Sequence, residues 1–167
     1  NAFEPADPGT LIGDQPAETP RVEMVTGLGV YALEMFEQDM VGVKGYDSAV
    51  LEVLRRHKAR IVAKTSNANT LTHYLDAPIE TVHRIERDLT RDFPSATVTA
   101  RDLAVVSAIG RDLSGLHVLL RGLTALEDAG IESVAVQQTT RDVDVQFVVP
   151  KEQMKPAIKA LHGTLVE

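Results

Sequence analysis

The chain has 167 residues, of which 44% are hydrophobic and 25% charged, a composition typical of a folded globular protein. Its 24 acidic residues outnumber its 17 basic ones, which disfavours a broad nucleic-acid or anionic-membrane surface but permits a small ligand held by a few local groups. There is no cysteine, which excludes disulfides, thiol catalysis, zinc–thiolate sites and iron–sulfur clusters. No apolar run approaches the roughly 20 residues of a membrane span, and no secretory signal is evident, so a cytoplasmic location is expected.

The first 20 residues predict a linker and not a packed element. They contain Pro5, Pro8, Pro16 and Pro20, which disfavour a continuous helix. Because the chain begins with Asn1 in place of an initiator methionine, we interpret it as a piece of a longer protein. Residues 1–20 would then be a strap that leads from an upstream domain.

From residue 22 onward, strand and helix patterns alternate. The expected elements are, in chain order, a strand at 22–36, a loop at 42–45, a helix at 46–57, strands at 60–65 and 70–75, a helix at 78–93 and a strand at 96–99. Gly27 and Gly29 are expected to divide the first strand into two segments. The first helix has apolar residues at i, i+3, i+4, i+7 and i+8 from Tyr46, with Asp47 and Ser48 as expected capping residues at its start.

The same order then recurs in the second half of the chain. The expected elements are a strand at 103–109, a loop at 110–115, a helix at 116–130, strands at 133–138 and 143–149 and a final helix after Pro150, which Pro156 is expected to shift or kink. This order predicts an α+β fold of two ferredoxin-like βαββαβ units, each an antiparallel sheet with helices on one face. The second unit lacks one strand, which residues 21–27 can supply. We therefore predict a first unit at 28–100, inserted into a second unit made of 21–27 plus 101–167.

Catalytic motifs are missing from the sequence. The five histidines show no metal-ligand spacing, so no metal is expected. Gly27-Leu28-Gly29 lacks the third glycine and the following helix of a dinucleotide fingerprint. Neither a phosphate-binding loop nor a nucleophile-elbow motif occurs. A small ferredoxin-like enzyme would need a polar catalytic cluster that the sequence does not show, and no catalytic residue is predicted.

Two loop-to-helix junctions carry the clearest binding signal. Residues 40–47 lead into the first predicted helix, and residues 110–115 hold the same place in the second unit. Free backbone N–H groups and the positive end of the helix dipole favour a carboxylate at such a junction, and glycines admit a close approach. The alternative is that these glycines serve only the turn, as many strand-to-helix connections require.

Several short motifs occur in an order that resembles the regulatory half of aspartokinases. They are Pro8-Gly9-Thr10-Leu11-Ile12, Val105-Val106-Ser107-Ala108-Ile109-Gly110, Phe147-Val148-Val149 and Ala160-Leu161-His162-Gly163. The resemblance covers essentially the whole chain and implies two ACT domains without the kinase domain. ATP and Mg²⁺ would bind only in that missing domain, so no cofactor is expected here and the chain would be regulatory. The parent enzyme would be the phosphotransferase that phosphorylates L-aspartate in lysine, threonine and methionine biosynthesis.

The resemblance also implies where an effector of the lysine or threonine class would bind, between ACT units. The corresponding positions are Met40, Val43, Tyr46, Asp47, Ile61, Val62 and Asn67, with Asp112, Leu113, Ser114, Gln137 and Gln138 as second-unit candidates. Backbone groups of the loop would take the ligand carboxylate, and Asp47 or Asn67 would hold its amine. Homodimerisation through the ACT sheets and contact with the chain's own kinase domain are implied as well.

The chain departs from the lysine-sensitive pattern at three places. Val62 stands where such relatives commonly have aspartate, Asn67 where they have serine, and Arg141-Asp142 where a Ser-Glu pair is frequent. Segments 35–42 and 65–70 resemble instead the aspartokinases of ectoine biosynthesis clusters, which gain little from inhibition by lysine. Two interpretations stay open: an amino-acid-sensing and dimerisation module, and a purely structural ACT dimerisation module with no effector.

Overall fold

The computed structural model describes residues 19–166, so almost all of the predicted strap at 1–20 lies outside the described residues. The elements are β1 (Arg21–Phe36), the 3₁₀ helix η1 (Gln38–Met40), α1 (Tyr46–Arg56), β2 (Arg60–Ser66), β3 (Thr70–Asp76), α2 (Ile79–Asp92), β4 (Thr97–Arg111), the 3₁₀ helix η2 (Leu113–Leu116), α3 (Val118–Asp128), β5 (Ala135–Gln138), β6 (Asp144–Pro150), the 3₁₀ helix η3 (Lys151–Gln153) and α4 (Met154–Leu165). The strands and α-helices follow the predicted order, and the 3₁₀ helices are additions that the sequence analysis did not predict.

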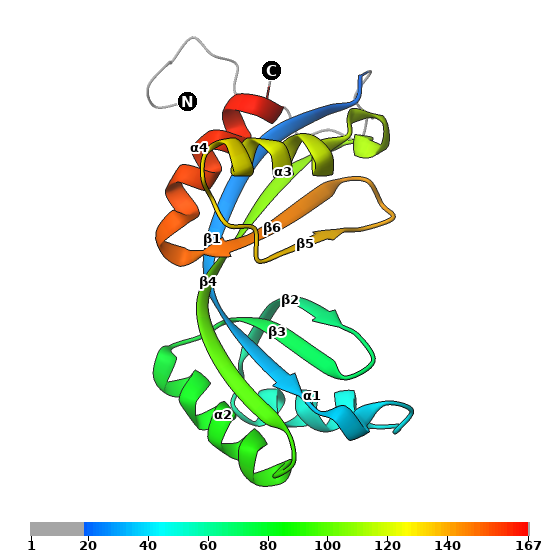
Figure 1. Cartoon of the computed structure of the whole chain (residues 1–167), viewed down its shortest axis with the longest axis vertical. Coiled ribbons are helices and arrows are strands. Elements are labelled where there is room, and N and C mark those ends of the chain that lie inside the picture. Colours follow the sequence, from blue (N-terminus) through cyan, green and yellow to red (C-terminus); the bar gives the residue numbers. More distant parts are fainter. Residues whose placement is uncertain (1–18, 167) are drawn as a thin grey trace.

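Within the described residues, six strands form one antiparallel sheet in the order β2-β3-β1-β4-β6-β5. β1 and β4 pair along their whole lengths, but β3 joins β1 only over residues 31–36 and β6 joins β4 only over residues 103–109. One half of the molecule therefore has the order β2-β3-β1-β4 and the other β1-β4-β6-β5, two ferredoxin-like sheets that share a central ribbon (Figure 1). The predicted fold class is confirmed, and the unit boundaries near residues 27 and 100 stay predictions.

The predicted interruption of the first strand is wrong. β1 runs unbroken for 16 residues, because Gly27 and Gly29 both keep their places in the ladder opposite β4. Gly27 serves the packing of α4: a Cβ added there would lie 2.8 Å from Ile158 Cδ1. The two strands predicted on either side of Arg101 and Asp102 are likewise one 15-residue strand, since these exposed polar residues belong to the same continuous ladder.

Helix ends in the second half follow the turn chemistry. Gly130 follows Ala129, the C-cap of α3, and has φ +67°, as its predicted role of helix stop requires. Pro150 opens η3, so α4 begins only at Met154, and Pro156 lies in the first turn of α4, where its missing N–H removes no helical bond. No helix among residues 19–166 has the length and apolar character needed to cross a bilayer.

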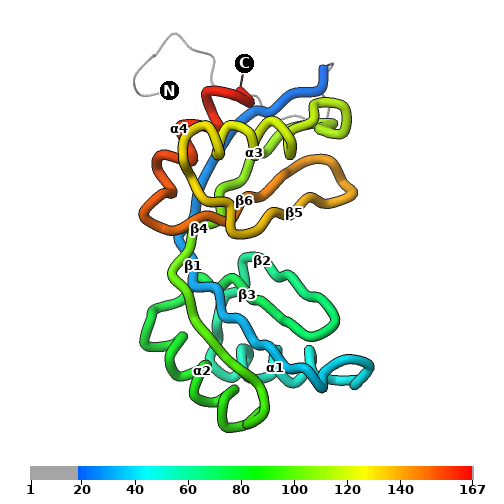
Figure 2. The backbone as a smooth tube through the Cα atoms, viewed as in Figure 1, coloured from blue at the N-terminus to red at the C-terminus, as the bar shows by residue number. Residues whose placement is uncertain are grey.

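The buried apolar residues form three clusters, one in each half and a third between the halves. α1 and α2 cover the first half of the sheet around Leu33 and Ile85, and α3 and α4 cover the second half around Phe147. The β2–β3 and β5–β6 hairpins project from the β1–β4 ribbon to the same side (Figure 2). Between them lies the third cluster, in which Tyr74 of the first half joins Val148 of the second. Because of this cluster, the sheet face opposite the helices is also partly buried.

Candidate effector site

The first predicted contact region is the N-terminus of α1. Gly42 and Gly45 in the preceding loop have φ of +77° and +96°, which glycine adopts without strain. Gly45 is the N-cap, and no side chain of the described residues bonds to the cap's N–H groups. Asp47 and Ser48 are therefore not caps, contrary to the prediction: the Ser48 hydroxyl donates to the Gly45 carbonyl at 2.8 Å, and Asp47 contacts β2. Within residues 19–166, the first-turn N–H groups of α1 thus have no side-chain acceptor.

Asp47 lies beside two residues that the sequence analysis did not select. Lys64 Nζ donates to Asp47 Oδ1 at 2.5 Å, and Lys64 stands opposite His73 in the β2–β3 ladder. His73 is 1% exposed, and its Nε2 has no hydrogen-bond partner among the described residues. Burial, and secondarily the Lys64 charge, lowers the pKa of His73 from 6.5 to about 4 in spite of Asp47. His73 is therefore neutral at pH 7, and Asp47 and Lys64 are the charged groups at this end of α1.

The other predicted residues of this junction differ in accessibility. Met40 is buried in the cluster beneath α1 and α2. The Tyr46 ring packs against Phe93, with 5.4 Å between ring centroids. Val43 is 54% exposed. Met40 and Tyr46 thus support the junction from the apolar cluster, and Val43 is the residue of the three that a ligand can reach from solvent.

The structure separates Asn67 from Asp47. Asn67 Oδ1 accepts the backbone N–H groups of Asn69 at 3.1 Å and Thr70 at 2.9 Å, a local bond pattern that closes the β2–β3 turn. Ile61 is exposed on β2, an edge strand of the described sheet, and Val62 packs against the third apolar cluster. Only Asp47, of the two predicted amine ligands, therefore lies at the α1 junction.

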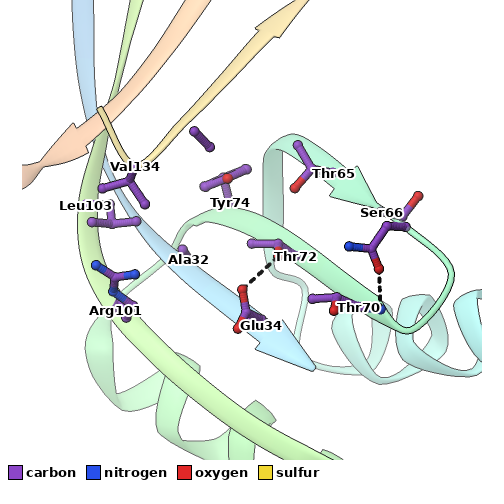
Figure 3. Close-up of a pocket in the computed structure, with 12 residues that line it drawn as sticks. Ala32, Glu34, Thr65, Ser66, Thr70, Thr72, Tyr74, Arg101, Leu103 and Val134 are labelled. Carbon is purple, nitrogen blue, oxygen red and sulfur yellow. Dashed lines mark hydrogen bonds between the residues drawn. The ribbon is translucent and has the colours of Figure 1, made fainter. Parts of the chain in front are cut away.

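A cavity of about 250 Å³ lies between the β2–β3 hairpin and the segment that leads into β5 (Figure 3). Its lining is mostly polar on the side of the hairpin and apolar toward the second half. The lining residues are Ala32, Glu34, Thr65, Ser66, Asn67, Thr70, Thr72, Tyr74, Arg101, Leu103, Val134 and Ala135. Asn67 is the only one of these that the sequence analysis selected, because the others come together only through strand pairing.

Two of the second-unit candidates, Leu113 and Gln138, form hydrogen bonds with Asp142. The Asp142 carbonyl accepts the N–H of Leu113, and its carboxylate accepts Gln138 Nε2 at 3.4 Å. The Ser114 hydroxyl donates to Asp112 Oδ1 at 3.0 Å, and Leu113 is buried. Gln137 instead pairs in register with Gln146 of β6. Hydrogen bonds through Asp142 therefore tie this junction to the turn between β5 and β6.

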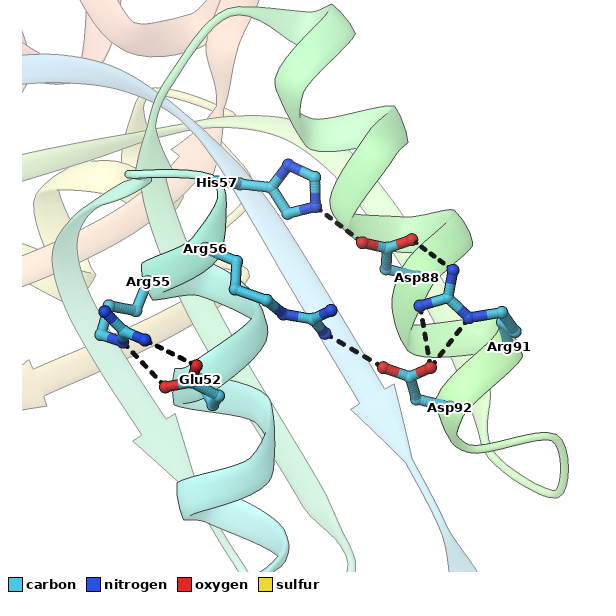
Figure 4. Close-up of polar contacts among 7 residues, drawn as sticks. All are labelled: Glu52, Arg55, Arg56, His57, Asp88, Arg91 and Asp92. Atoms are coloured by element: carbon cyan, nitrogen blue, oxygen red, sulfur yellow. Dashed lines mark hydrogen bonds and ion pairs between the residues drawn. The ribbon is translucent and has the colours of Figure 1, made fainter.

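The outer surface of α1 and α2 carries an ion-pair network (Figure 4). His57 Nε2 lies 2.8 Å from Asp88 Oδ2, and Arg56 and Arg91 both bind Asp92. The hydrogen bond with His57 holds the pKa of Asp88 below its usual value, with help from nearby arginines. The network joins α1 to α2 on the side away from the sheet, and we assign it a structural role. No group of three or more acidic or histidine side chains among residues 19–166 is arranged to hold a metal ion.

Solved structures identify the class of this fold. The regulatory subunit of aspartate kinase from Thermus flavus superposes with a TM-score of 0.73 at 15% identity, over 86% of this chain and 98% of that one. Aspartokinase III of E. coli, in complex with lysine and aspartate, superposes with a TM-score of 0.69 at 19% identity, over 90% of this chain and 35% of that one. The fold is therefore that of the ACT-domain regulatory part of aspartokinases.

The sequence comparison points the same way. No family model matches the chain. Aspartate kinase Ask_Ect of Stutzerimonas stutzeri is 41% identical over 169 residues, an alignment that covers all of this chain and 36% of that relative. The chain thus spans about a third of that relative's length. The resemblance predicted from the motifs is confirmed: the chain matches the regulatory region of an aspartokinase and not its kinase domain.

Proposed function

We propose that this chain is the regulatory module of an aspartokinase, which binds a free amino acid and pairs with a second copy of itself. The observation that carries the proposal is the α1 N-terminus, which lacks a side-chain cap and lies beside the Asp47–Lys64 ion pair. The lysine complex of the E. coli neighbour supports an amino-acid effector. The relationship to Ask_Ect supports the ectoine-cluster subtype that segments 35–42 and 65–70 resemble.

The site has groups for both ends of an amino acid. The ligand carboxylate would bind the first-turn N–H groups of α1 and Lys64 Nζ, and its ammonium would bind Asp47. Both side chains are reachable, at 30% exposure for Lys64 and 47% for Asp47. In the free protein they neutralise each other, so an incoming zwitterion replaces one ion pair by two and leaves no charge unpaired.

Regulation requires that the effector bind two states of the parent enzyme unequally. An effector site at an ACT interface meets this requirement if the pairing of two chains changes the geometry of the site, because the effector then binds the two states with different affinities. β2 and β5 are the edge strands of the described sheet, and Ile61 and Val136 on them are each about 40% exposed. Unpaired, partly apolar edges favour pairing with a second copy. In such a pair the effector would bias phosphorylation of L-aspartate by ATP in the parent enzyme.

The same edges suit the second candidate, a structural dimerisation module without an effector. The observation in its favour is that Lys64 already neutralises Asp47. Val62, where lysine-sensitive relatives commonly carry aspartate, packs against an apolar cluster and offers no ligand group. The two candidates differ in one measurable property, the response of the protein to amino acids.

Asp47→Asn should abolish the stabilisation that an effector bound at the α1 junction produces, while leaving the fold intact. The assay is the melting temperature against millimolar lysine, threonine, methionine and ectoine. An effector at 100 times its dissociation constant adds about 2.7 kcal/mol to the parent protein, or roughly 5 to 10 °C. Asp76→Asn is the matched control, because Asp76 also makes a surface ion pair, with Arg60 at 3.0 Å. Equal shifts in the parent and Asp47→Asn would exclude Asp47 from the site, and no shift with any compound would favour the structural module.

A further inference from the structure

The cavity between the two hairpins lies away from the α1 junction and has its own charged groups. Glu34 comes from β1 and Arg101 from β4, and the ladder places Arg101 opposite Ala32. Because side chains two residues apart on a strand share a face, Glu34 and Arg101 are diagonal neighbours on the cavity face, with the small Ala32 next to both (Figure 3). One acidic and one basic group thus stand at the same cavity wall.

These two charges do not satisfy each other. Among residues 19–166, Glu34 accepts a hydrogen bond from the hydroxyl of buried Thr72 at 3.4 Å, and Arg101 makes neither a hydrogen bond nor an ion pair. Elsewhere on the surface, arginines such as Arg55 and Arg60 bind carboxylates at 2.8 and 3.0 Å. Two opposite charges held apart across Ala32 favour a ligand that carries both complementary charges, with a short spacing between them.

The remaining walls limit the size and character of that ligand. The hydroxyls of Thr65, Thr70 and Thr72 line the hairpin side, and Leu103 and Val134 close the side of the second half. A volume of about 250 Å³ is below the roughly 300 to 1,000 Å³ of sites for drug-sized molecules. The cavity therefore suits a small zwitterion with a compact side chain that can hydrogen-bond.

We propose that this cavity binds a free α-amino acid, with its carboxylate on Arg101 and its ammonium on Glu34. The arginine fork matches a carboxylate, and Glu34 accepts from an ammonium. The side chain of the ligand lies toward the threonine hydroxyls. Because Val134 belongs to the second half of the molecule and Thr72 to the first, the bound amino acid links the two halves. This site is separate from the one at Asp47 and does not depend on it.

The test is calorimetric titration of the whole chain with L-threonine, L-lysine and L-methionine, each up to about 10 mM, a range that detects millimolar dissociation constants. Glu34→Gln and Arg101→Gln each remove one charge from an exposed side chain, and both should weaken binding about tenfold to hundredfold. N-acetyl and carboxamide derivatives of the amino acid that binds should lose a similar factor, because each lacks one of its charges. Glu23→Gln is the matched control, because Glu23 lies on the same strand as Glu34, binds Arg111 at 2.9 Å and is outside the cavity. The Glu23→Gln variant should bind the amino acid with the same affinity as the parent.

Asp47→Asn separates this site from the α1 site. Binding that Asp47→Asn preserves and Glu34→Gln weakens by that factor supports the cavity site. Binding that Asp47→Asn abolishes and both cavity variants preserve overturns the cavity site and leaves the proposed function standing. The absence of binding by all three amino acids, with the parent chain folded, overturns the cavity site as well.

Discussion

Replacing Gly110 by alanine should destabilise the protein by about 3 kcal/mol or more. A Cβ at this position would lie 2.1 Å from the carbonyl oxygen of Arg21 and 2.8 Å from Val22 Cα, both backbone atoms of β1. Backbone atoms in a ladder cannot turn away as a side chain does, so β1 and β4 must separate at their ends. Overpacking of this kind costs roughly 1 to 3 kcal/mol where side chains can adjust, and more where they cannot.

Chemical denaturation of the parent, Gly110→Ala and Gly115→Ala measures this effect. Gly115 is the control because no atom lies within 4 Å of the position of its Cβ and its φ is not positive. Its replacement should change the free energy of unfolding by less than about 0.5 kcal/mol. A Gly110→Ala protein as stable as the parent would show that β1 and β4 can move apart at this end of the ladder at little cost in free energy. The sequence interpretation gave Gly110 a role in ligand approach, and the structure shows that β1 occupies that space.

Acidification from pH 7 to pH 4 should cost about 3 kcal/mol of stability through His73 alone. Burial lowers the pKa of His73 to about 4, whereas the unfolded chain has the ordinary value of 6.5. Between these values the unfolded state binds more protons than the folded state, so the free energy of unfolding falls as pH falls. The stabilisation is complete above about pH 6.5 and is lost progressively down to about pH 4, at 1.36 kcal/mol for each pH unit between the two pKa values.

His73→Leu should remove this part of the acid sensitivity. Leucine suits the position, since Leu71 and Leu75 lie on the same face of β3 and belong to the apolar cluster. The measurement is the free energy of unfolding of both proteins at several pH values between 4 and 7. His83→Leu, on the exposed side of α2, is the control and should keep the parent's pH dependence. A His73→Leu protein that loses stability with acid as steeply as the parent would show that His73 is not the source of the acid sensitivity.

Local patterns in the sequence predicted the elements, because the spacing of apolar residues records which face of a helix is buried. The periodicity from Tyr46 and the Gly130 stop are examples, and both helices are found where expected. The repeated order of elements was sufficient for the ferredoxin-like fold class, since a βαββαβ order has few antiparallel solutions. The same local reasoning wrongly predicted a strand break at Gly27 and Gly29. At Gly27 the missing side chain instead leaves room for α4 to pack against the sheet.

The candidate sites also depend partly on local sequence and partly on tertiary structure. By itself, the sequence determined the element order, the fold class and the α1 junction, because each depends on neighbours along the chain. Only the tertiary structure paired Lys64 with Asp47 and buried His73 beside them. It also placed Asn67 at the cavity between the two hairpins and not at the α1 junction. It also brought Glu34 and Arg101, 67 positions apart, to one wall through the register of β1 and β4. Register is decided by the burial of whole strand faces on both sides of the sheet, and no short segment of the chain contains that information.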